Sequence, residues 1–260
     1  MAAISTDPLP RALSGARLAV VGHGRLGTAL CAALRAADVQ VQGPLGREER
    51  PEGADAVLLC VPDSEIPTAA AAMAGLSRLV GHTSGATPLA ALAPAAATAF
   101  GLHPLQTFTG AEGPARFAGA GCAVAGATPA ALAFASDLAH CLGMRPFEIA
   151  DEHRPAYHAA ASIASNFLVA LEATAEQVAG GAGIEPAEAR ALLAPLVRST
   201  VDNWAALGPE RALTGPVARG DDATVARQRK AVAEAAPGSL ALFDALVART
   251  RALAAHKVLL

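Results

Sequence analysis

Four polar side chains in a predicted helix over residues 157–178 have the types and spacing needed for proton transfer and substrate binding. His158, Ser162 and Asn166 follow one another at intervals of four, so they share one face of a stretch that is otherwise apolar. An imidazole titrates near neutral pH, so we expect His158 to supply a proton. Ser162 and Asn166 would orient an oxygen or nitrogen atom, and Tyr157 would contact the substrate. The alternative is that these groups bond to the backbone or to a neighbouring helix.

A glycine-rich turn near the start of the chain could hold a dinucleotide. It follows the apolar run 18–21, typical of a buried parallel strand, and precedes an Ala/Leu-rich stretch that predicts a helix over 28–37. This is the context that a G-x-G-x-x-G motif requires. The first glycine permits a tight turn, the second lets a pyrophosphate approach the backbone, and the third lets the helix pack closely on the strand. We expect all six residues of the motif to contact the cofactor: Gly22, His23, Gly24, Arg25, Leu26 and Gly27.

The residues after the second predicted strand, 39–42, bear on which dinucleotide binds. An NAD site carries an acidic residue at the end of this strand, but here the strand is followed by Gly43-Pro44-Leu45-Gly46. Arg47 lies just beyond, and a guanidinium there can pair with a 2′-phosphate. The sequence therefore favours NADP, with a solvated surface arginine as the alternative.

Three further strand ends and one loop supply candidate contacts. Val61 and Pro62 end a buried strand, where they would line the cofactor cleft. Ser84 and Gly85 lie in a turn whose hydroxyl and N–H groups suit a nicotinamide ribose or a carboxylate, unless the turn caps the next helix. His103 ends another strand before a proline and could form an active-site wall, or be a structural histidine bonded to the backbone.

Arg219 lies in a loop of two glycines and a proline over residues 214–221. Its guanidinium offers a fork for a substrate carboxylate. A surface arginine in a turn between helices is the alternative.

These residues are distributed over two predicted domains. Alternating strands and helices predict an α/β fold over residues 1–150, a Rossmann-type doubly wound and mostly parallel sheet, with residues 1–14 as a loose leader. Helices alone are predicted over residues 151–260. This all-α part would bind substrate.

Composition excludes several classes of function. A formal net charge of −3 gives no reason to expect a nucleic acid or a membrane surface as partner. The four cysteines are scattered without a C-x-x-C pair, which indicates buried thiols in a reducing compartment rather than disulfides or a metal site. We therefore expect a cytoplasmic protein that acts on a small molecule and holds no metal.

The motifs together resemble the Rossmann-like proteins that carry a C-terminal helical domain of unknown function. These proteins are described as deazaflavin-dependent NADP oxidoreductases and belong to the 6-phosphogluconate dehydrogenase-like group, with the pyrroline-5-carboxylate reductases. The resemblance implies a Rossmann domain, NADP, and a homodimer formed by the helical domain. It is carried by Gly22-His-Gly-Arg-Leu-Gly27, Val61-Pro62-Asp63, Thr83-Ser84-Gly85, His103-Pro-Leu-Gln-Thr-Phe108, Tyr157-His158-Ala-Ala-Ala-Ser162, Ser165-Asn166, Leu213-Thr-Gly-Pro216 and Arg219-Gly-Asp221.

One departure from that group concerns the proton donor. The β-hydroxyacid dehydrogenases carry a catalytic lysine four residues before the asparagine of this helix, and here that position is Ser162. We expect an NADP-dependent oxidoreductase that transfers a hydride to or from a small, carboxylated carbonyl or imine compound. The alternatives are a non-catalytic NADP-binding regulator and a deazaflavin-linked NADP oxidoreductase.

Overall fold

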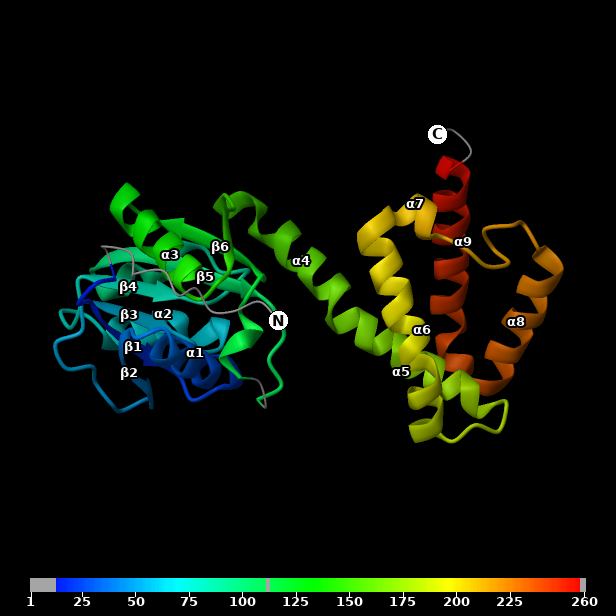
Figure 1. Ribbon diagram of the computed structural model, residues 1–260, viewed down its shortest axis with the longest axis horizontal. Helices are drawn as coiled ribbons and strands as arrows, with labels where there is room; N and C mark the ends of the chain where they lie inside the picture. Colours follow the sequence, from blue (N-terminus) through cyan, green and yellow to red (C-terminus); the bar gives the residue numbers. More distant parts are fainter. Residues whose placement is uncertain (1–12, 111–112, 258–260) are drawn as a thin grey trace. The chain divides into compact units, whose positions relative to one another are not determined.

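The apolar run 18–21 forms most of β1, the strand from which a seven-stranded sheet extends in both directions. The structure is a computed structural model that describes residues 13–110 and 113–257. In Figure 1 the labels β4, β3, β1 and β2 follow one another down the first unit, in agreement with the sheet order β2-β1-β3-β4-β5-β6-β7. The strands are β1 (Arg17–Val21), β2 (Gln40–Leu45), β3 (Ala56–Leu59), β4 (Leu79–His82), β5 (Thr98–Leu105), β6 (Gly121–Gly126) and β7 (Arg145–Glu148).

The strand directions confirm the predicted fold class. Strands β2, β1, β3, β4 and β5 are parallel to one another, so their carboxyl ends meet at one edge of the sheet. Strand β6 runs antiparallel to β5, and β7 is parallel to β6. The result is the mostly parallel Rossmann-type sheet that the alternating sequence pattern predicts.

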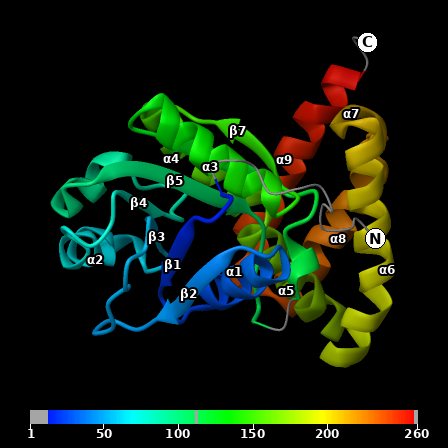
Figure 2. The ribbon, with the colours of Figure 1, turned by 60° about the vertical axis from the view of Figure 1, so that its left-hand side comes forward.

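Helices cover both faces of this sheet. Helices α1 (Arg25–Ala36) and α3 (Pro129–Cys141) share one buried cluster with Leu18 and Val20 of β1. Helix α2 (Ile66–Ala72) and the 3-10 helix η2 (Leu89–Ala95) share the other with Ala19 and Val21. Successive residues of a strand point to opposite faces, which explains why one apolar run serves two cores. Figure 2 shows α1 and α3 with the strands between them and α2.

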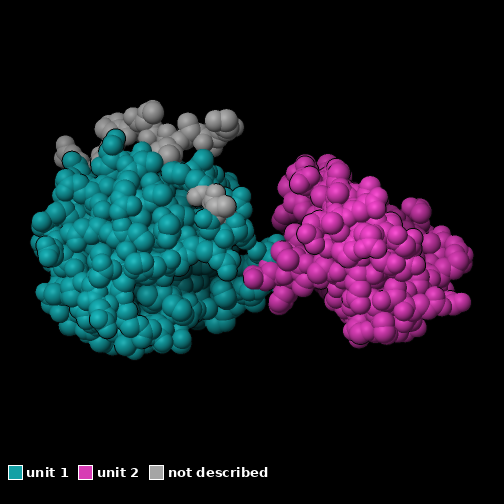
Figure 3. All heavy atoms as spheres, turned by 90° about the horizontal axis from the view of Figure 1, so that it is seen from below, with its two compact units in different colours: residues 1–165 teal, residues 166–260 magenta. Residues whose placement is uncertain are grey.

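The chain divides into two compact units, residues 1–165 and 166–260, which Figure 3 draws in teal and magenta. We expected the boundary at residue 150. The difference is helix α4 (Arg154–Ala164), which belongs to the first unit because its side chains contact the sheet. Arg154 is 2% exposed, and Tyr157 bonds to a histidine of β5.

The predicted single helix over residues 157–178 is interrupted. Helix α4 ends at Ala164, and Ser165 has φ −120° and ψ −76°, outside the helical region. Asn166 then opens α5. Serine and asparagine side chains compete with helical backbone hydrogen bonds, and two of them in succession favour such a break. The shared face therefore holds for His158 and Ser162 within α4, but the spacing argument does not carry over to Asn166.

The second unit is all helical, as predicted. Helix α5 packs against α6 and α8, and α8 packs against α9. Three ion pairs of the described residues join neighbouring helices of this unit: Arg190 to Glu176 at 2.7 Å, Arg229 to Asp244 at 2.8 Å, and Arg251 to Asp222 at 2.5 Å. The helices are α5 (Asn166–Gly180), α6 (Pro186–Leu207), α7 (Pro209–Ala212), α8 (Asp222–Ala235) and α9 (Leu240–Lys257).

Two further findings concern the predicted leader and the possibility of a membrane-spanning helix. The predicted leader, residues 1–14, lies mostly outside the described residues, but Leu13 is 1% exposed and packs in the first core cluster. Within residues 13–110 and 113–257, no helix has both the length and the apolar character needed to cross a membrane.

Candidate functional site

The glycine-rich turn has the geometry that its three glycines predict. Gly22 has φ +122°, and a Cβ there would lie 2.2 Å from the carbonyl oxygen of Cys60. A Cβ at Gly27 would lie 2.1 Å from the carbonyl oxygen of Gly22, so α1 approaches β1 as closely as a glycine allows. Gly24 differs, because a Cβ there would meet no atom of the described residues within 4 Å. The turn is therefore filled by protein at its first and third glycines and open at the second.

The open glycine lies at the amino end of α1. Gly24 is the N-cap residue, and no side chain caps the helix. The first backbone N–H groups of a helix have no partner within it, and the helix dipole favours an anion there. Arg25 begins the helix and its Nη1 donates to the carbonyl oxygen of Phe108 at 3.4 Å. Leu26 packs against the first core cluster, so its side chain contributes to the fold.

A cavity of about 200 Å³ adjoins this turn. It lies beyond the carboxyl ends of β1, β2 and β3, the edge where open α/β sheets bind ligands. Val61 and Pro62 line it, as does the first turn of the glycine motif. Its apolar wall comes from β2, the end of β3, and α2, with Leu45, Val61, Ala69, Ala72 and Met73, and its polar lining includes His23, Arg47 and Glu65.

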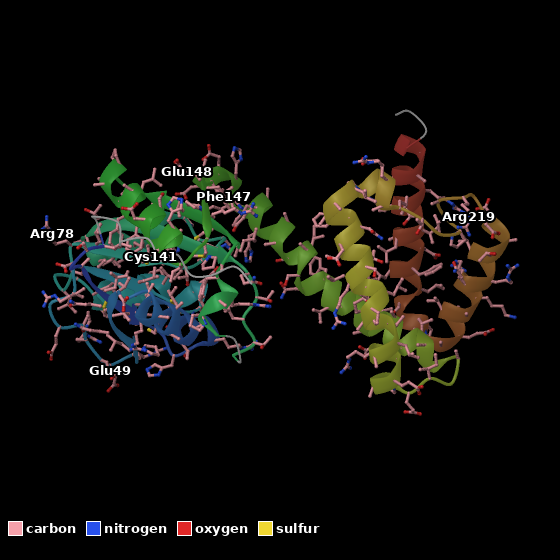
Figure 4. The ribbon with its side chains drawn as sticks, in the orientation of Figure 1. Glu49, Arg78, Cys141, Phe147, Glu148 and Arg219 are labelled. Atoms are coloured by element: carbon pink, nitrogen blue, oxygen red, sulfur yellow. The ribbon has the colours of Figure 1, made fainter. Side chains whose placement is uncertain are left out.

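Two glutamates contact polar groups of residues that line this cavity. Arg47 pairs with Glu65 at 3.2 Å. Glu49, which Figure 4 labels, lies 3.6 Å from Nε2 of His23 and accepts a hydrogen bond from the backbone N–H of Gly46. The arginine predicted for a 2′-phosphate is thus at the cavity, but a carboxylate already engages it.

The turn after β4 is held by its own hydroxyls. Ser84 Oγ accepts from the N–H of Thr87 at 2.9 Å and donates to Oγ1 of Thr87 at 2.9 Å. The backbone N–H of Ser84 donates to Nδ1 of His82 at 3.2 Å. Burial and the Arg154 guanidinium lower the pKa of His82 to about 4. This geometry gives the Ser84 hydroxyl a turn-forming role, the alternative that the sequence left open.

His103 and Tyr157 come from different elements and meet. Nδ1 of His103 on β5 lies 2.6 Å from the hydroxyl oxygen of Tyr157 on α4. The imidazole edge lies against Gly85, where a Cβ would come within 2.8 Å of Cε1 and Nε2. His103, predicted as an active-site residue, therefore contacts both Tyr157, predicted to bind substrate, and Gly85, predicted to bind the cofactor.

Burial shifts the pKa values of His103 and Tyr157 in opposite directions. Burial, with His158 and Arg154 nearby, lowers the pKa of His103 to about 4. Burial and the Cys122 thiol raise the pKa of Tyr157 to about 12. At neutral pH the imidazole is neutral and the phenol keeps its proton. In the tautomer that carries its proton on Nε2, the phenol donates to Nδ1 and the Nε2–H faces the Ser84-Gly85 turn.

The other predicted residues are placed differently. His158 is exposed on α4, with its ring centroid 6.3 Å from that of His103. Ser162 is half-buried one turn further along α4. Asn166 and Arg219 belong to the second unit, Asn166 at the start of α5 and Arg219 exposed on the loop before α8. Figure 4 shows Arg219 on that loop.

Sequence reasoning missed Arg154. Its Nε donates to Asp151 Oδ1 at 2.6 Å, and its guanidinium lies near Gly101 of β5. A charged residue this deeply buried requires a counter-charge, which Asp151 supplies. The signal in the sequence is weak, a single arginine at the start of a helix. The described residues contain no group of three His, Cys, Asp or Glu side chains that could hold a metal ion.

The mostly parallel sheet, its glycine-rich turn after β1 and the helices that follow define a class: Rossmann-type proteins with a C-terminal helical part. Residues 120–250 match the domain of unknown function DUF2520, and the chain belongs to that family. No curated protein matches the chain.

Solved structures share the fold over nearly the whole chain. BF3122 from Bacteroides fragilis, provisionally described as an NADP oxidoreductase, is 20% identical with a TM-score of 0.78, over 91% of this chain and 98% of its own. Protein TM1727 from Thermotoga maritima is 25% identical with a TM-score of 0.72, over 92% and 99%. Pyrroline carboxylate reductase from Plasmodium falciparum, solved with NADP bound, is 11% identical with a TM-score of 0.59, over 93% and 99%. At such identities the likeness establishes the fold.

Proposed function

We propose that the protein is an NADP-dependent oxidoreductase that transfers a hydride to or from a small, carboxylated carbonyl or imine compound, with Arg219 as the proposed partner of the carboxylate. The observation that carries the proposal is the open space over Gly24 at the uncapped amino end of α1. The adjoining cavity, with Arg47 and Glu65 at its polar side, suits an adenosine. An NADP-bound reductase of the same fold supports the choice of cofactor.

The residues that would hold NADP fit that group. The pyrophosphate would lie on the N–H groups at the start of α1, because these donors lack helical partners. The nicotinamide ring would lie near Ser84, Gly85 and His103. When bound, the nicotinamide supplies or accepts the hydride. The chain itself must orient the substrate and move a proton.

We assign the proton transfer to His103 and Tyr157. Nε2–H of His103 would give its proton to the substrate oxygen or nitrogen while Nδ1 takes the phenolic proton across the 2.6 Å contact. The phenolate left on Tyr157 then recovers a proton from solvent. His158, the donor expected from the sequence, is the alternative, since it lies beside His103. Asn166, Ser162 and Arg219 remain predictions for substrate contacts.

The test combines binding and turnover. Calorimetry measures NADPH binding, and NADPH oxidation is followed with a panel of 2-keto acids, ketopantoate and cyclic imines. Tyr157→Phe should lower kcat on the best substrate by about 100-fold, the usual contribution of a general acid, with NADPH affinity unchanged. His158→Gln is the matched variant on the same helix. A larger loss in His158→Gln than in Tyr157→Phe would assign the proton to His158.

A second function has one observation in its favour. Ser162 stands where the β-hydroxyacid dehydrogenases carry their catalytic lysine. A regulator that binds NADP without reacting would not need that lysine. If the protein binds NADPH but oxidises it with no member of the panel, the result would favour the non-catalytic regulator.

We also propose a homodimer formed by the helical unit. The most exposed large apolar side chains of this unit lie on α5 and α6, and they include Val169 on α5 and Leu192, Leu196 and Trp204 on α6. A cavity of about 500 Å³ lies between α5 and α6 and is lined mainly by apolar residues. Free, buried thiols at Cys31, Cys122 and Cys141 support a reducing compartment, for which we propose the cytoplasm.

A further inference from the structure

The loop after β2 folds back on the glycine-rich turn. Glu49 accepts a hydrogen bond from the N–H of Gly46, at the end of β2, and lies 3.6 Å from Nε2 of His23. Arg50 holds this shape, since its Nη1 donates to the carbonyl oxygens of Arg47 at 3.0 Å and Glu49 at 3.1 Å. The loop thus returns a carboxylate to the strand end where the sequence has no acid.

The second carboxylate comes from the other side of the cavity. Glu65, just before α2, lies 3.2 Å from Nη2 of Arg47. Both residues line the cavity that adjoins the glycine-rich turn, together with His23 and Gly46. A backbone N–H, an imidazole and a guanidinium therefore belong to residues that line the same cavity. Each of them is engaged by a glutamate.

Such a set of donors has the chemistry of a phosphate site. A phosphate monoester takes hydrogen bonds from backbone N–H groups and from guanidinium and imidazole groups. At the end of the second strand of a Rossmann sheet, the ligand group that arrives is the 2′ position of the adenosine ribose. A 2′-phosphate would have to displace Glu49 from Gly46 and His23, and Glu65 from Arg47. A free 2′-hydroxyl could instead donate to Glu49 where it stands.

We infer that Glu49 determines the choice between NADP and NAD, because its carboxylate occupies the donors of the 2′-phosphate subsite and is itself an acceptor for unphosphorylated ribose. Glu65 restrains Arg47 in the same way and has a smaller effect. This inference rests on the proposed dinucleotide site. It adds that the two glutamates limit the preference for NADP that Arg47 provides.

The test measures binding alone, so no substrate is needed. Dissociation constants are determined by calorimetry for NADPH, NADH, adenosine 2′,5′-bisphosphate and ADP. Glu49→Gln should raise the ratio of NADPH to NADH affinity about ten-fold, by tightening NADPH and weakening NADH. Glu65→Gln should tighten NADPH about three-fold, in keeping with an exposed ion pair. Arg47→Met should weaken NADPH and adenosine 2′,5′-bisphosphate and leave NADH and ADP unchanged.

Glu48→Gln is the matched control. Glu48 is exposed on the same loop, makes no hydrogen bond or ion pair with the described residues, and loses the same charge on substitution. A ten-fold rise in Glu49→Gln that Glu48→Gln does not share supports the inference. Equal ratios in the two variants would refute it while leaving the proposed function intact. Binding of neither dinucleotide by the unmodified protein would refute the proposed function as well.

Discussion

His82 ends β4, His103 lies two residues before the end of the neighbouring parallel strand β5, and both have a neutral imidazole at neutral pH. Burial is the main cause, and it lowers the pKa of each to about 4. The Arg154 guanidinium acts in the same direction, while the Asp63 carboxylate opposes it. A neutral imidazole can donate through one nitrogen and accept through the other. His103 uses Nδ1 toward Tyr157, so its second nitrogen is available on the side of Gly85.

These pKa values predict how stability depends on pH. An unfolded histidine takes up a proton near pH 6.5, but His82 and His103 in the folded chain do so only near pH 4. Each therefore stabilises the fold fully above pH 6.5 and loses this contribution as the pH falls toward 4. Between pH 6.5 and 5 we expect a loss of about 2 kcal/mol for each histidine in the free energy of unfolding. Urea unfolding at several pH values measures it.

The variant His103→Asn provides the control for this pH dependence. Asparagine does not titrate, so the slope of stability against pH should decrease by the share that His103 contributes. The remaining slope should come from His82, which is fully buried. A slope identical to that of the unmodified protein would show that His103 is already protonated, or already exposed, in the folded chain.

At the scale of elements, the strand–turn–helix unit of β1 and α1 separates stability from binding. Gly22 and Gly27 are surrounded by backbone atoms, whereas Gly24 faces open space. Packing therefore requires glycine at the first and third positions. At the second position the fold does not require glycine, so a bound ligand would be the reason for it.

Substitution by alanine tests this separation. Gly22→Ala should lower the free energy of unfolding by more than about 2 kcal/mol, because φ is +122° and the new Cβ would clash with the Cys60 carbonyl. Gly24→Ala should change it by less than about 0.5 kcal/mol, since φ is −64° and no neighbour is close. The same Gly24→Ala should weaken NADPH binding by at least about ten-fold. If the folded Gly24→Ala protein binds NADPH with unchanged affinity, the turn is not part of the binding site.

Local patterns predicted most of the first unit, because each strand is a short apolar run bounded by turn residues. The strand over residues 18–21 and the helix that follows the glycine-rich turn were predicted from such patterns directly. The break at Ser165 did not, since the apolar periodicity continues through it. It depends on the backbone angles of one residue, which periodicity does not reveal.

The candidate site was predictable where it depends on backbone and not where it depends on loop folding. The glycines could be placed because a turn of this kind needs them. The return of Glu49 to Gly46 could not be foreseen, because it depends on the hydrogen bonds that Arg50 makes to two carbonyl oxygens. The contact between His103 and Tyr157 joins residues 54 positions apart, and no local pattern encodes it.

At the scale of the whole chain, the family match and the glycine-rich turn lie in different parts of the sequence. The match covers residues 120–250, which include α4 and most of the helical unit, whereas the glycine-rich turn lies near the start. Tyr157, His158 and Arg219 therefore lie in the part that defines the family. Dinucleotide binding is a property of many Rossmann sheets, so the contacts proposed for Tyr157, His158 and Arg219 are the ones that we expect to be particular to this family.

The exposed apolar surface of the helical unit leads to the last prediction, that two copies of the chain associate through α5 and α6. Leu196 is 63% exposed and Trp204 is 57% exposed, although both are large apolar side chains on well-formed helices. Contiguous apolar surface of this kind usually marks an interface, and a stable dimer buries about 1,600 Å² in total. Light scattering after size-exclusion chromatography should give twice the 25.9 kDa mass of the chain.

The variant Leu196→Lys should convert this dimer to a monomer, because an interfacial lysine must be desolvated without a partner. Gln228→Lys on α8 makes the same change of charge at an exposed position of another helix and should leave the dimer intact. Circular dichroism establishes that both variants fold. Two results would contradict the prediction that α5 and α6 form the interface. The Leu196→Lys variant could remain a dimer, or the unmodified protein could be a monomer at micromolar concentration. The apolar surface of α5 and α6 would then bind something other than a second copy of the chain. The substrate contact predicted for Asn166, at the start of α5, would be the first to test.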